Sequence, residues 1–398
     1  MKHLSRLASQ LSGQKMFQIM DKARAIEATG REVIHLEIGD PDFDTPPSVV
    51  AACKAALDSG MTHYVSSYGL AELRAAGAET TLKSRGFKPD IEQIVVTAGA
   101  NIQLYYVVAC TVNPGDEVII TDPSFVSYQE ITRLVGGIPV TVSLREENGF
   151  RLDPDDLEKA ITKKTRLIIT NSPHNPTGSV IQSDAYKAIY DICERHDLYL
   201  LSDEVYGRMV YETPEVRFFS PSVFDQCKER VIVAHSLSKS FSMTGWRIGA
   251  VTAPIVLARK IALLLETTSS CVSPFVQKAA ISALTETKEY VDGMMLEFRR
   301  RRDVLVSALN RMDGVSCLPP DGAFYAFANI KRTGLTSIQF SDVLLEQYGI
   351  AVCPGVYFGK AGEGYVRFCF AQSMQKLRRA TELMQNFKAL PVNLKLTK

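Results

Sequence analysis

The sequence has no C-x-x-C pair, no N-glycosylation sequon and no run of about 18 apolar residues. The missing cysteine pairs argue against a zinc site or a redox dithiol, and the eight cysteines are scattered along the chain. Such scattered cysteines are typical of reduced thiols rather than of a disulfide framework. The N-terminal residues lack the apolar core of a signal peptide. We therefore expect a cytoplasmic protein with no membrane segment and no metal site.

An excess of either charge is also missing. The 45 lysine and arginine residues nearly balance the 44 aspartate and glutamate residues, so the formal net charge is +1. This balance gives no reason to expect a nucleic-acid partner. One basic run, residues 299–302, lies between Glu297 and Asp303 in a stretch with a helical pattern, and we expect it to form a solvated helix face.

What is present is a long chain with a regular alternation of apolar and helical segments. At 398 residues it exceeds the usual size of one hydrophobic core, which predicts two domains. The alternation from about residue 94 onward is typical of an α/β fold, with a mostly parallel sheet and helices on both faces. Ligands of such sheets bind at the carboxyl ends of the strands. We expect strands at 94–97, 118–120, 140–142, 167–169, 199–201, 231–233 and 248–251.

One lysine stands in a loop of small residues between two apolar runs. It is Lys239, within the segment 236–249. A lysine beside packed surface loses hydration, so its pKa falls and its neutral amine can form an imine with a carbonyl. Ser236, Ser238 and Arg247 could bind a phosphate ester nearby. A lysine imine beside a phosphate points to pyridoxal 5'-phosphate, with a solvated loop lysine as the alternative.

The segment 236–239 also satisfies the S-x-x-K pattern of serine acyl-transfer enzymes. Those enzymes need S-D-N and K-T-G tripeptides as well, and neither tripeptide occurs in this sequence. We therefore reject this interpretation of Lys239.

Polar residues follow several other expected strands. Asp203 comes directly after an apolar strand, so its carboxylate is partly buried and needs a cationic partner. The protonated ring nitrogen of pyridoxal phosphate would be such a partner, and a helix N-cap is the alternative. Asn175 and Tyr206 could donate hydrogen bonds to the phenolate oxygen of the ring. Phe125 could stack on the ring or belong to the core.

Three further positions are candidates for anion binding or close ligand approach. The small residues Gly99 to Asn101 open a helix, and such a turn is either a phosphate cradle or an ordinary strand-to-helix connection. Arg367 is flanked by apolar residues on a strand, so it needs an anion, either a substrate carboxylate or a structural partner. Gly39 lies in a proline-rich segment and would let a ligand approach the backbone.

Taken together, these residues resemble the class I aminotransferases of the fold-type I pyridoxal phosphate enzymes, most closely the branch of prokaryotic aspartate and related aminotransferases. The resemblance implies a PLP-dependent transferase with a mostly parallel sheet, helices on both faces, and a smaller α+β domain. It also implies transfer of an amino group between an L-amino acid and a 2-oxo acid by a ping-pong mechanism, with 2-oxoglutarate or glutamate as one partner. The motifs that carry it extend over nearly the whole chain, at 39–43, Tyr64, 175–178, 203–206, 236–249, 322–325 and Arg367.

The resemblance assigns roles to the candidate residues. Lys239 would be the Schiff-base lysine and the proton shuttle. Asp203 would pair with the ring nitrogen, Asn175 and Tyr206 would bind the phenolate oxygen, and Phe125 would stack on the ring.

Other residues of the site follow from the same resemblance. Arg367 would bind the substrate α-carboxylate together with Gly39 and Asn175. Tyr64 would reach the phosphate bound by the neighbouring subunit, which implies a homodimer with shared active sites. The phosphate itself would be held by Gly99, Ala100, Asn101, Ser236 and Arg247.

The family layout also predicts the domain boundaries. A large cofactor-binding domain would cover residues 46–288. The N-terminal segment 1–45 would join a small C-terminal domain at 289–398, so the small domain is discontinuous in sequence.

Two residues depart from the aspartate-specific pattern. Phe125 stands where those enzymes usually carry tryptophan, and Asn101 stands where related enzymes carry a lysine that binds the distal carboxylate. The missing cation argues against acidic donors, because a buried carboxylate without a partner is costly. Gln14 or Lys15 could substitute for it. Lyases and cyclases that act on amino acids use the same fold, and they are alternatives to an aminotransferase. A non-catalytic ligand-binding homologue is a further alternative.

Overall fold

The computed structural model describes residues 3–5, 8, 13 and 15–388. Among these residues, seven strands form a central sheet in the order β2-β8-β7-β6-β5-β3-β4. Strand β8 is antiparallel to both of its neighbours, and the other pairings are parallel. The strands are β2 (Ile94–Thr97), β3 (Glu117–Asp122), β4 (Ile138–Ser143), β5 (Thr165–Asn171), β6 (Tyr199–Asp203), β7 (Val231–Ser236) and β8 (Gly249–Thr252).

The expected α/β fold with a mostly parallel sheet is confirmed, and each strand expected from residue 94 onward is present. The antiparallel strand has a simple cause. Parallel neighbours need a long crossover connection, usually a helix. The connection from β7 to β8 contains the Lys239 loop and a single short 3₁₀ turn, so the chain returns in the opposite direction.

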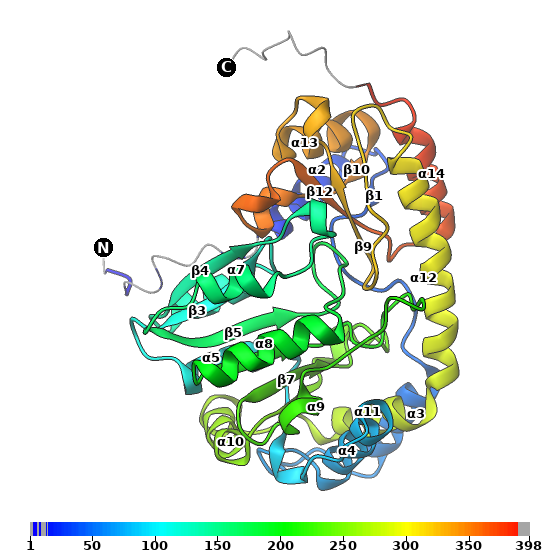
Figure 1. Cartoon of the computed structure of the whole chain (residues 1–398). Coiled ribbons are helices and arrows are strands. Elements are labelled where there is room, and N and C mark those ends of the chain that lie inside the picture. The colour runs from blue at the N-terminus through cyan, green and yellow to red at the C-terminus, as the bar shows by residue number, and fades with distance from the viewer. Residues whose placement is uncertain (1–2, 6–7, 9–12, 14, 389–398) are drawn as a thin grey trace.

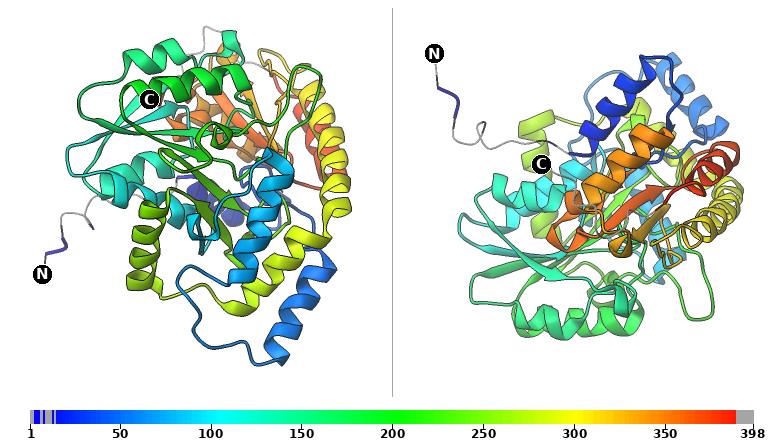
Figure 2. Two further views of the ribbon diagram at one scale, coloured as in Figure 1. Left: turned by 60° about the horizontal axis from the view of Figure 1, so that its bottom comes forward. Right: turned by 90° about the horizontal axis from the view of Figure 1, so that it is seen from above.

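Both faces of this sheet are covered by helices (Figure 1, Figure 2). Alternate residues of a strand point to opposite faces. In β3, Ile119 packs in a cluster with residues of α8 (Ser183–Arg195), whereas Val118 and Ile120 pack in a cluster with residues of α5 (Ala100–Thr111). Since both faces are apolar, the polar residues collect at the strand ends.

The remaining helices and strands surround this sheet or form a second, smaller unit. The strands β9, β11 and β12 make an antiparallel sheet in the order β11-β12-β9. Their bounds are β9 (Tyr325–Asn329), β10 (Ile350–Ala351), β11 (Cys353–Pro354) and β12 (Tyr365–Cys369). The helices are α2 (Met16–Glu27), α3 (Pro47–Asp58), α4 (Ala71–Arg85), α6 (Ser127–Leu134), α7 (Pro154–Lys159), α9 (Ser222–Asp225), α10 (Ile255–Ser269), α11 (Pro274–Glu286), α12 (Lys288–Leu309), α13 (Ser337–Tyr348) and α14 (Met374–Met384).

The N-terminal segment packs with the C-terminal elements. Strand β1 (Ile34–His35) pairs in parallel with β10, with Ile34 opposite Ile350. A separate core cluster joins residues of α12, α13 and α14 with residues of β9 and β12. Helix α12 runs along one side of the molecule, from α11 to this second group (Figure 1).

The expectation of a solvated face at residues 299–302 is wrong for Arg301. Its side chain is buried, with ion pairs to Asp42 and to Glu297, where the Nε to Oε1 distance is 3.0 Å. The guanidinium also lies over the rings of Phe43 and Phe298. Asp42 is remote from α12 in the sequence, so the pattern of the helix alone gave no sign of this partner.

Some features of the described residues bear on the chemistry of the chain. All eight cysteines are free thiols. Within the described residues, no helix combines the length and the apolar character needed to cross a bilayer. The same part of the chain contains no group of three or more histidine, cysteine, aspartate or glutamate side chains placed to hold a metal ion.

Candidate active site

A cavity of about 340 Å³ lies where the carboxyl ends of β5, β6 and β7 meet the N-terminal segment and β12. Residues far apart in the sequence meet in its lining. Tyr64 and Gly99 are not in that lining. The predicted site residues that line it are Gly39, Ala100, Asn101, Phe125, Asn175, Asp203, Tyr206, Ser236, Lys239, Arg247 and Arg367.

Lys239 is partly buried against the backbone of the N-terminal segment. Its Nζ donates a hydrogen bond to the carbonyl oxygen of Gly39 at 2.6 Å. Burial lowers the pKa of Lys239 to about 8, since loss of hydration outweighs the attraction of the Asp40 carboxylate. A neutral amine is therefore accessible near neutral pH, as a lysine that attacks a carbonyl requires.

The lowered pKa of Lys239 predicts a distinctive pH dependence in the cofactor-free protein. Its acylation rate should rise with a midpoint near pH 8 rather than near the ordinary lysine value of 10.5. Between about pH 8 and pH 10.5, Lys239 is protonated in the unfolded chain and neutral in the folded chain. The free energy of unfolding should therefore increase as the pH rises through this window. Pulse acylation followed by peptide mass spectrometry measures the midpoint, with exposed Lys187 as the reference. A midpoint at the ordinary value would contradict the prediction.

Asp203 ends β6 and is buried, and its carboxylate is held by neutral donors. Oδ2 accepts a hydrogen bond from the hydroxyl of Tyr128 at 2.6 Å, and Oδ1 accepts one from the backbone N–H of Val205 at 3.1 Å. No α-helix begins here, so Asp203 is not a helix N-cap. Burial raises the pKa of Asp203 to about 6, even though the hydrogen bond from Tyr128 lowers it. A cation placed against this carboxylate would relieve the cost of its burial.

Tyr128 is a contact that the sequence analysis did not assign. It lies on α6, three residues after Phe125, and the two rings meet edge to face with their centroids 5.7 Å apart. Phe125 lies just before α6, so Tyr128 is close to it in the sequence. That spacing could have placed Tyr128 beside the expected cofactor.

Replacing Tyr128 with phenylalanine should weaken cofactor binding. The variant loses a hydrogen bond to a charged group, which is worth about 1.5–3 kcal/mol, so the dissociation constant for pyridoxal phosphate should rise about tenfold or more. The pKa of Asp203 should rise further as well, because the hydrogen bond from Tyr128 lowers it. Equilibrium titration of the cofactor measures the effect. Tyr105→Phe, outside the cavity lining, is the control and should bind like the parent protein.

Three further polar contacts order the wall between Asp203 and Arg367. The hydroxyls of Tyr206 and Tyr325 are 2.8 Å apart, and Tyr325 is a second residue without an assigned role in the sequence analysis. The backbone N–H of Asn175 donates to Oδ1 of Asn171 at 2.8 Å, and the Asn171 amide donates to the carbonyl oxygen of Asp203. These bonds hold the side chains of Asn175 and Tyr206 at the cavity.

Arg367 lies in the cavity wall with only 1% of its surface exposed. Its Nη1 donates to Oδ1 of Asn175 at 3.0 Å and its Nη2 donates to the carbonyl oxygen of Glu37, while the ring centroids of Tyr325 and Phe358 lie 4.4 and 4.7 Å from its Cζ. No ion pair to a carboxylate is present among the described residues, and its buried Nε has no hydrogen-bond partner there. The positive charge of Arg367 therefore lacks a counter-charge, which favours a bound carboxylate over a structural ion pair.

Close packing shapes the opposite end of the cavity around Arg247. Gly99 has φ +83°, and a Cβ at this position would lie 2.5 Å from Nη2 of Arg247. Helix α5 begins at Ala100, so its first N–H groups are available to a ligand. The hydroxyl of Ser236 donates to Oγ of Ser238 at 2.9 Å. This combination of an arginine, hydroxyls and a helix start fits a phosphate monoester.

Three predicted residues lie away from the cavity or outside the described structure. Tyr64 is 86% exposed. Lys15 lies over the ring of Tyr357, with its Nζ 5.7 Å from the ring centroid, and does not line the cavity. Gln14 lies outside the described residues.

Comparison with known proteins decides the family. The family model "Aminotransferase class I and II" matches residues 31–383. The chain belongs to this aminotransferase family. An aspartate aminotransferase of Pyrococcus horikoshii is 41% identical over 92% of each chain, and aromatic-amino-acid aminotransferase 2 of Thermococcus litoralis is 42% identical over 92% of this chain and 94% of its own. The solved structure of Thermus thermophilus aspartate aminotransferase with maleate superimposes with a TM-score of 0.92 at 34% identity, covering 97% of this chain and 99% of that one.

Membership of this aminotransferase family confirms the expected fold type and enzyme class. The protein is a pyridoxal phosphate-dependent transferase that moves amino groups between an amino acid and a 2-oxo acid. The cavity fits that cofactor. It combines a partly buried lysine with a lowered pKa, a buried carboxylate without a cationic partner in the described residues, and a phosphate cradle in which Gly99 leaves room for Arg247.

Proposed function

We propose that Lys239 is the residue that binds the cofactor covalently and moves the proton during amino transfer. The observation that supports this most strongly is the meeting of Lys239, Asp203 and Arg367 in one cavity, each with an unmet need for a charged or reactive partner. Nζ of Lys239 alternates between neutral and protonated forms near neutral pH because its pKa is about 8. It is therefore suited to take up and return a proton at the substrate α-carbon.

The cofactor's ring would be oriented by groups on three sides. When bound, pyridoxal phosphate supplies a carbonyl that carries the amino group and a ring that withdraws electrons from the reacting carbon. Asp203 would hold a proton on the ring nitrogen, and Asn175 and Tyr206 would donate to the phenolate oxygen. Phe125 would cover one face of the ring and exclude water from it.

The two anionic ends of the bound molecules would be held by separate arginines. Arg247 would bind the phosphate, and Arg367 would bind the substrate α-carboxylate together with Asn175 and the backbone at Gly39. One substrate position serves both half-reactions, so donor and acceptor bind in turn in a ping-pong order. The other phosphate ligands are Gly99, Ala100, Asn101 and Ser236.

We further propose that the donor side chain is apolar or aromatic rather than acidic. The described cations of the lining are Lys239, Arg247 and Arg367, and each already has a role. Asn101 contributes no charge, and the mouth is lined by Met16, Phe17 and Ile38. The names of the relatives mention both aspartate and aromatic amino acids and do not decide between them. The cavity lining is therefore the stronger guide to the donor side chain. The distal carboxylate of glutamate or 2-oxoglutarate would need a cation from the second subunit.

An absorbance spectrum during titration with single amino acids tests this assignment. Without any 2-oxo acid, phenylalanine or leucine should convert the bound cofactor to its amino form at least about tenfold more efficiently than aspartate, because a buried distal carboxylate would lack a partner. Adding 2-oxoglutarate or pyruvate should restore the original spectrum and identify the acceptor. Faster conversion by aspartate would refute the donor assignment. Release of ammonia without amino transfer would instead indicate a lyase.

A homodimer with shared active sites is part of the same proposal. The exposed Tyr64 loop lies beside α10, since the hydroxyl of Ser67 donates to Glu266 at 3.2 Å. The exposed apolar side chains of Val256 and Leu263 on α10 extend this surface. Such a patch is typical of a subunit interface. It supports the view that Tyr64 reaches the phosphate bound by the neighbouring subunit.

The domain division and the location also stay proposals. The small domain would join residues 1–45 and 289–398, which the pairing of β1 with β10 supports. The large domain would cover 46–288, and α12 would connect the two. The eight free thiols support a reducing compartment such as the cytoplasm.

A further inference from the structure

A second cavity, of about 160 Å³, adjoins the active-site cavity. Val205 and Ser236 line both cavities. The second cavity is also lined by residues of α4 and of the Lys239 loop, and it contains the side chains of Arg85 and Arg208. None of its charged groups has a role in the amino transfer described above.

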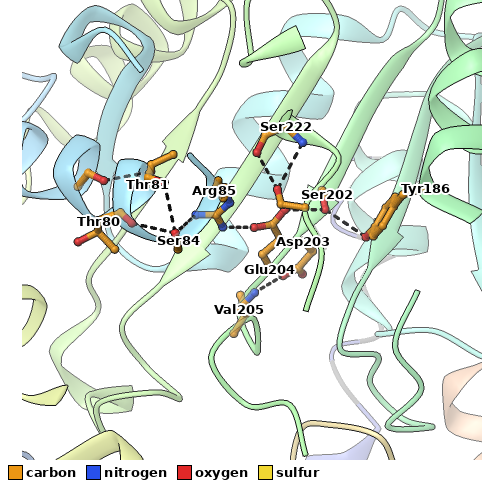
Figure 3. A network of polar contacts seen from close by, with 12 residues as sticks. Thr80, Thr81, Ser84, Arg85, Tyr186, Ser202, Asp203, Glu204, Val205 and Ser222 are labelled. Carbon is orange, nitrogen blue, oxygen red and sulfur yellow. Dashed lines mark hydrogen bonds and ion pairs between the residues drawn. The ribbon is translucent and has the colours of Figure 1, made fainter. Parts of the chain in front are cut away.

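Arg85 is almost completely enclosed at this cavity, with 8% of its side chain exposed. Its Nη2 forms an ion pair with Glu204, and its Nη1 donates to Oγ of Ser84 at 3.2 Å (Figure 3). The buried Nε of Arg85 has no hydrogen-bond partner among the described residues. The guanidinium also lies 5.6 Å from the ring centroid of Phe218, which lines the same cavity.

Glu204 is already fully engaged. Its Oε1 accepts hydrogen bonds from the hydroxyls of Ser202 at 3.1 Å and Ser220 at 2.5 Å, and its Oε2 pairs with Arg85. The hydroxyl of Ser202 lies 3.3 Å from that of Tyr186 in the same network (Figure 3). This network holds the carboxylate in place, so Glu204 neutralises Arg85 and no second cation.

Arg208 is the second cation, and the described part of the chain offers it neither a hydrogen bond nor a carboxylate. Its guanidinium lies 5.2 Å from the ring centroid of Phe241, and the residue is exposed, so it stands where the cavity meets solvent. The nearby His235 is uncharged at neutral pH, because burial and then the charges of Arg85 and Arg208 hold its pKa well below the usual range. Two arginines and one carboxylate give the cavity lining a net charge of +1.

We propose that this second cavity binds a small oxyanion, a phosphate group or a carboxylate, between Arg85 and Arg208. The anion would supply the counter-charge that Arg208 lacks and would lie beside the positive charge of Arg85. Arginine forks match the planar or tetrahedral oxygens of such groups. Val205 follows the Asp203-Glu204 pair, and Ser236 precedes Lys239. An anion bound in the second cavity would therefore lie beside the backbone segments that position Asp203 and Lys239.

Calorimetric titration of the cofactor-loaded enzyme with inorganic phosphate tests the proposal. The loaded form is used because pyridoxal phosphate then occupies the phosphate cradle at Arg247. The parent protein should bind one phosphate per chain, and Arg208→Gln should weaken this binding by about tenfold or more, the loss of a charge-assisted contact. Arg299→Gln is the matched control, since Arg299 is another arginine that lies over an aromatic ring, that of Tyr211, and it does not line the second cavity.

Three further measurements complete the test. Arg85→Lys keeps the charge but loses the fork, and it should also weaken binding. If the Arg85→Lys variant does not fold, the phosphate affinity of Arg208→Gln alone decides whether the proposal holds. Acetate in place of phosphate separates the two ligand classes, because tighter binding of acetate than of phosphate would assign the site to carboxylates. In the parent protein, phosphate should also shift the pH midpoint of the cofactor absorbance, and this shift should disappear in Arg208→Gln. Equal phosphate affinity in the parent, Arg208→Gln and Arg299→Gln proteins would overturn the proposal.

Discussion

Replacing Lys239 with alanine should lower the rate of amino transfer by about 10⁴-fold or more. The change removes the amine that we propose binds the cofactor and carries the proton, and Lys239 is the one lysine among the described residues of the cavity lining. The contacts at Asp203 and Arg247 stay in place, so the variant should still hold pyridoxal phosphate without a covalent bond. Reduction with borohydride should fix the cofactor to the parent chain and not to the variant.

Two controls separate chemistry from folding in the Lys239 experiment. Lys187→Ala removes an exposed lysine that pairs with Asp191 on α8 and should leave the rate unchanged. Lys239→Arg keeps a positive charge but provides no neutral amine, so it should be as inactive as the alanine variant. A Lys239→Ala enzyme that keeps more than about a hundredth of the parent rate would show that another group carries the proton.

Replacing Arg367 with glutamine should lower kcat/KM by about 10²–10³-fold, because a bound carboxylate loses its buried partner at a cost of about 3–5 kcal/mol. Arg367→Lys keeps the charge but loses the fork, so its loss should be smaller, about tenfold. The effect should appear mainly in KM, since the α-carboxylate is bound in the ground state and in the transition state alike.

A substrate comparison makes the Arg367 prediction specific. The parent enzyme should strongly prefer an amino acid over the corresponding amine without the α-carboxylate, and Arg367→Gln should lose this preference. The conversion of each compound is followed by the cofactor absorbance. Arg166→Gln, which removes an exposed arginine of β5 that lies near Asp116, is the control. An unchanged preference in Arg367→Gln would place the carboxylate elsewhere.

Much of the fold could be predicted because the relevant signals are local. The apolar runs of the central strands are short and bounded by turns, and each became a strand. Strand β2 has the expected bounds, and the other strands differ from theirs by a few residues at one or both ends. The ends moved because hydrogen bonding to a neighbouring strand extends regular structure beyond the apolar run. Strand β1 was not predicted, because it has only the two residues Ile34–His35 and exists through its pairing with the two residues of β10.

The meeting of the candidate site residues in one cavity could be predicted for a related reason. The carboxyl ends of parallel strands lie along one edge of the sheet, so Asp203 after β6 and Lys239 after β7 must come close once the strands pair. Residue type together with position after a strand was therefore enough to select them. Tyr128 and Tyr325 were missed because their roles depend on hydrogen bonds to Asp203 and Tyr206, which a sequence does not record.

The sequence by itself determined the order of strands and helices, the lysine in its small-residue loop and the family to which the motifs point. The tertiary structure decided which charges have partners. The buried Arg301 forms an ion pair with Asp42, and Arg85 forms one with Glu204. Arg367 contacts no carboxylate in the described structure. The physical reason is that secondary structure follows from neighbouring residues, whereas the cost of a buried charge depends on groups brought close by folding from distant parts of the chain.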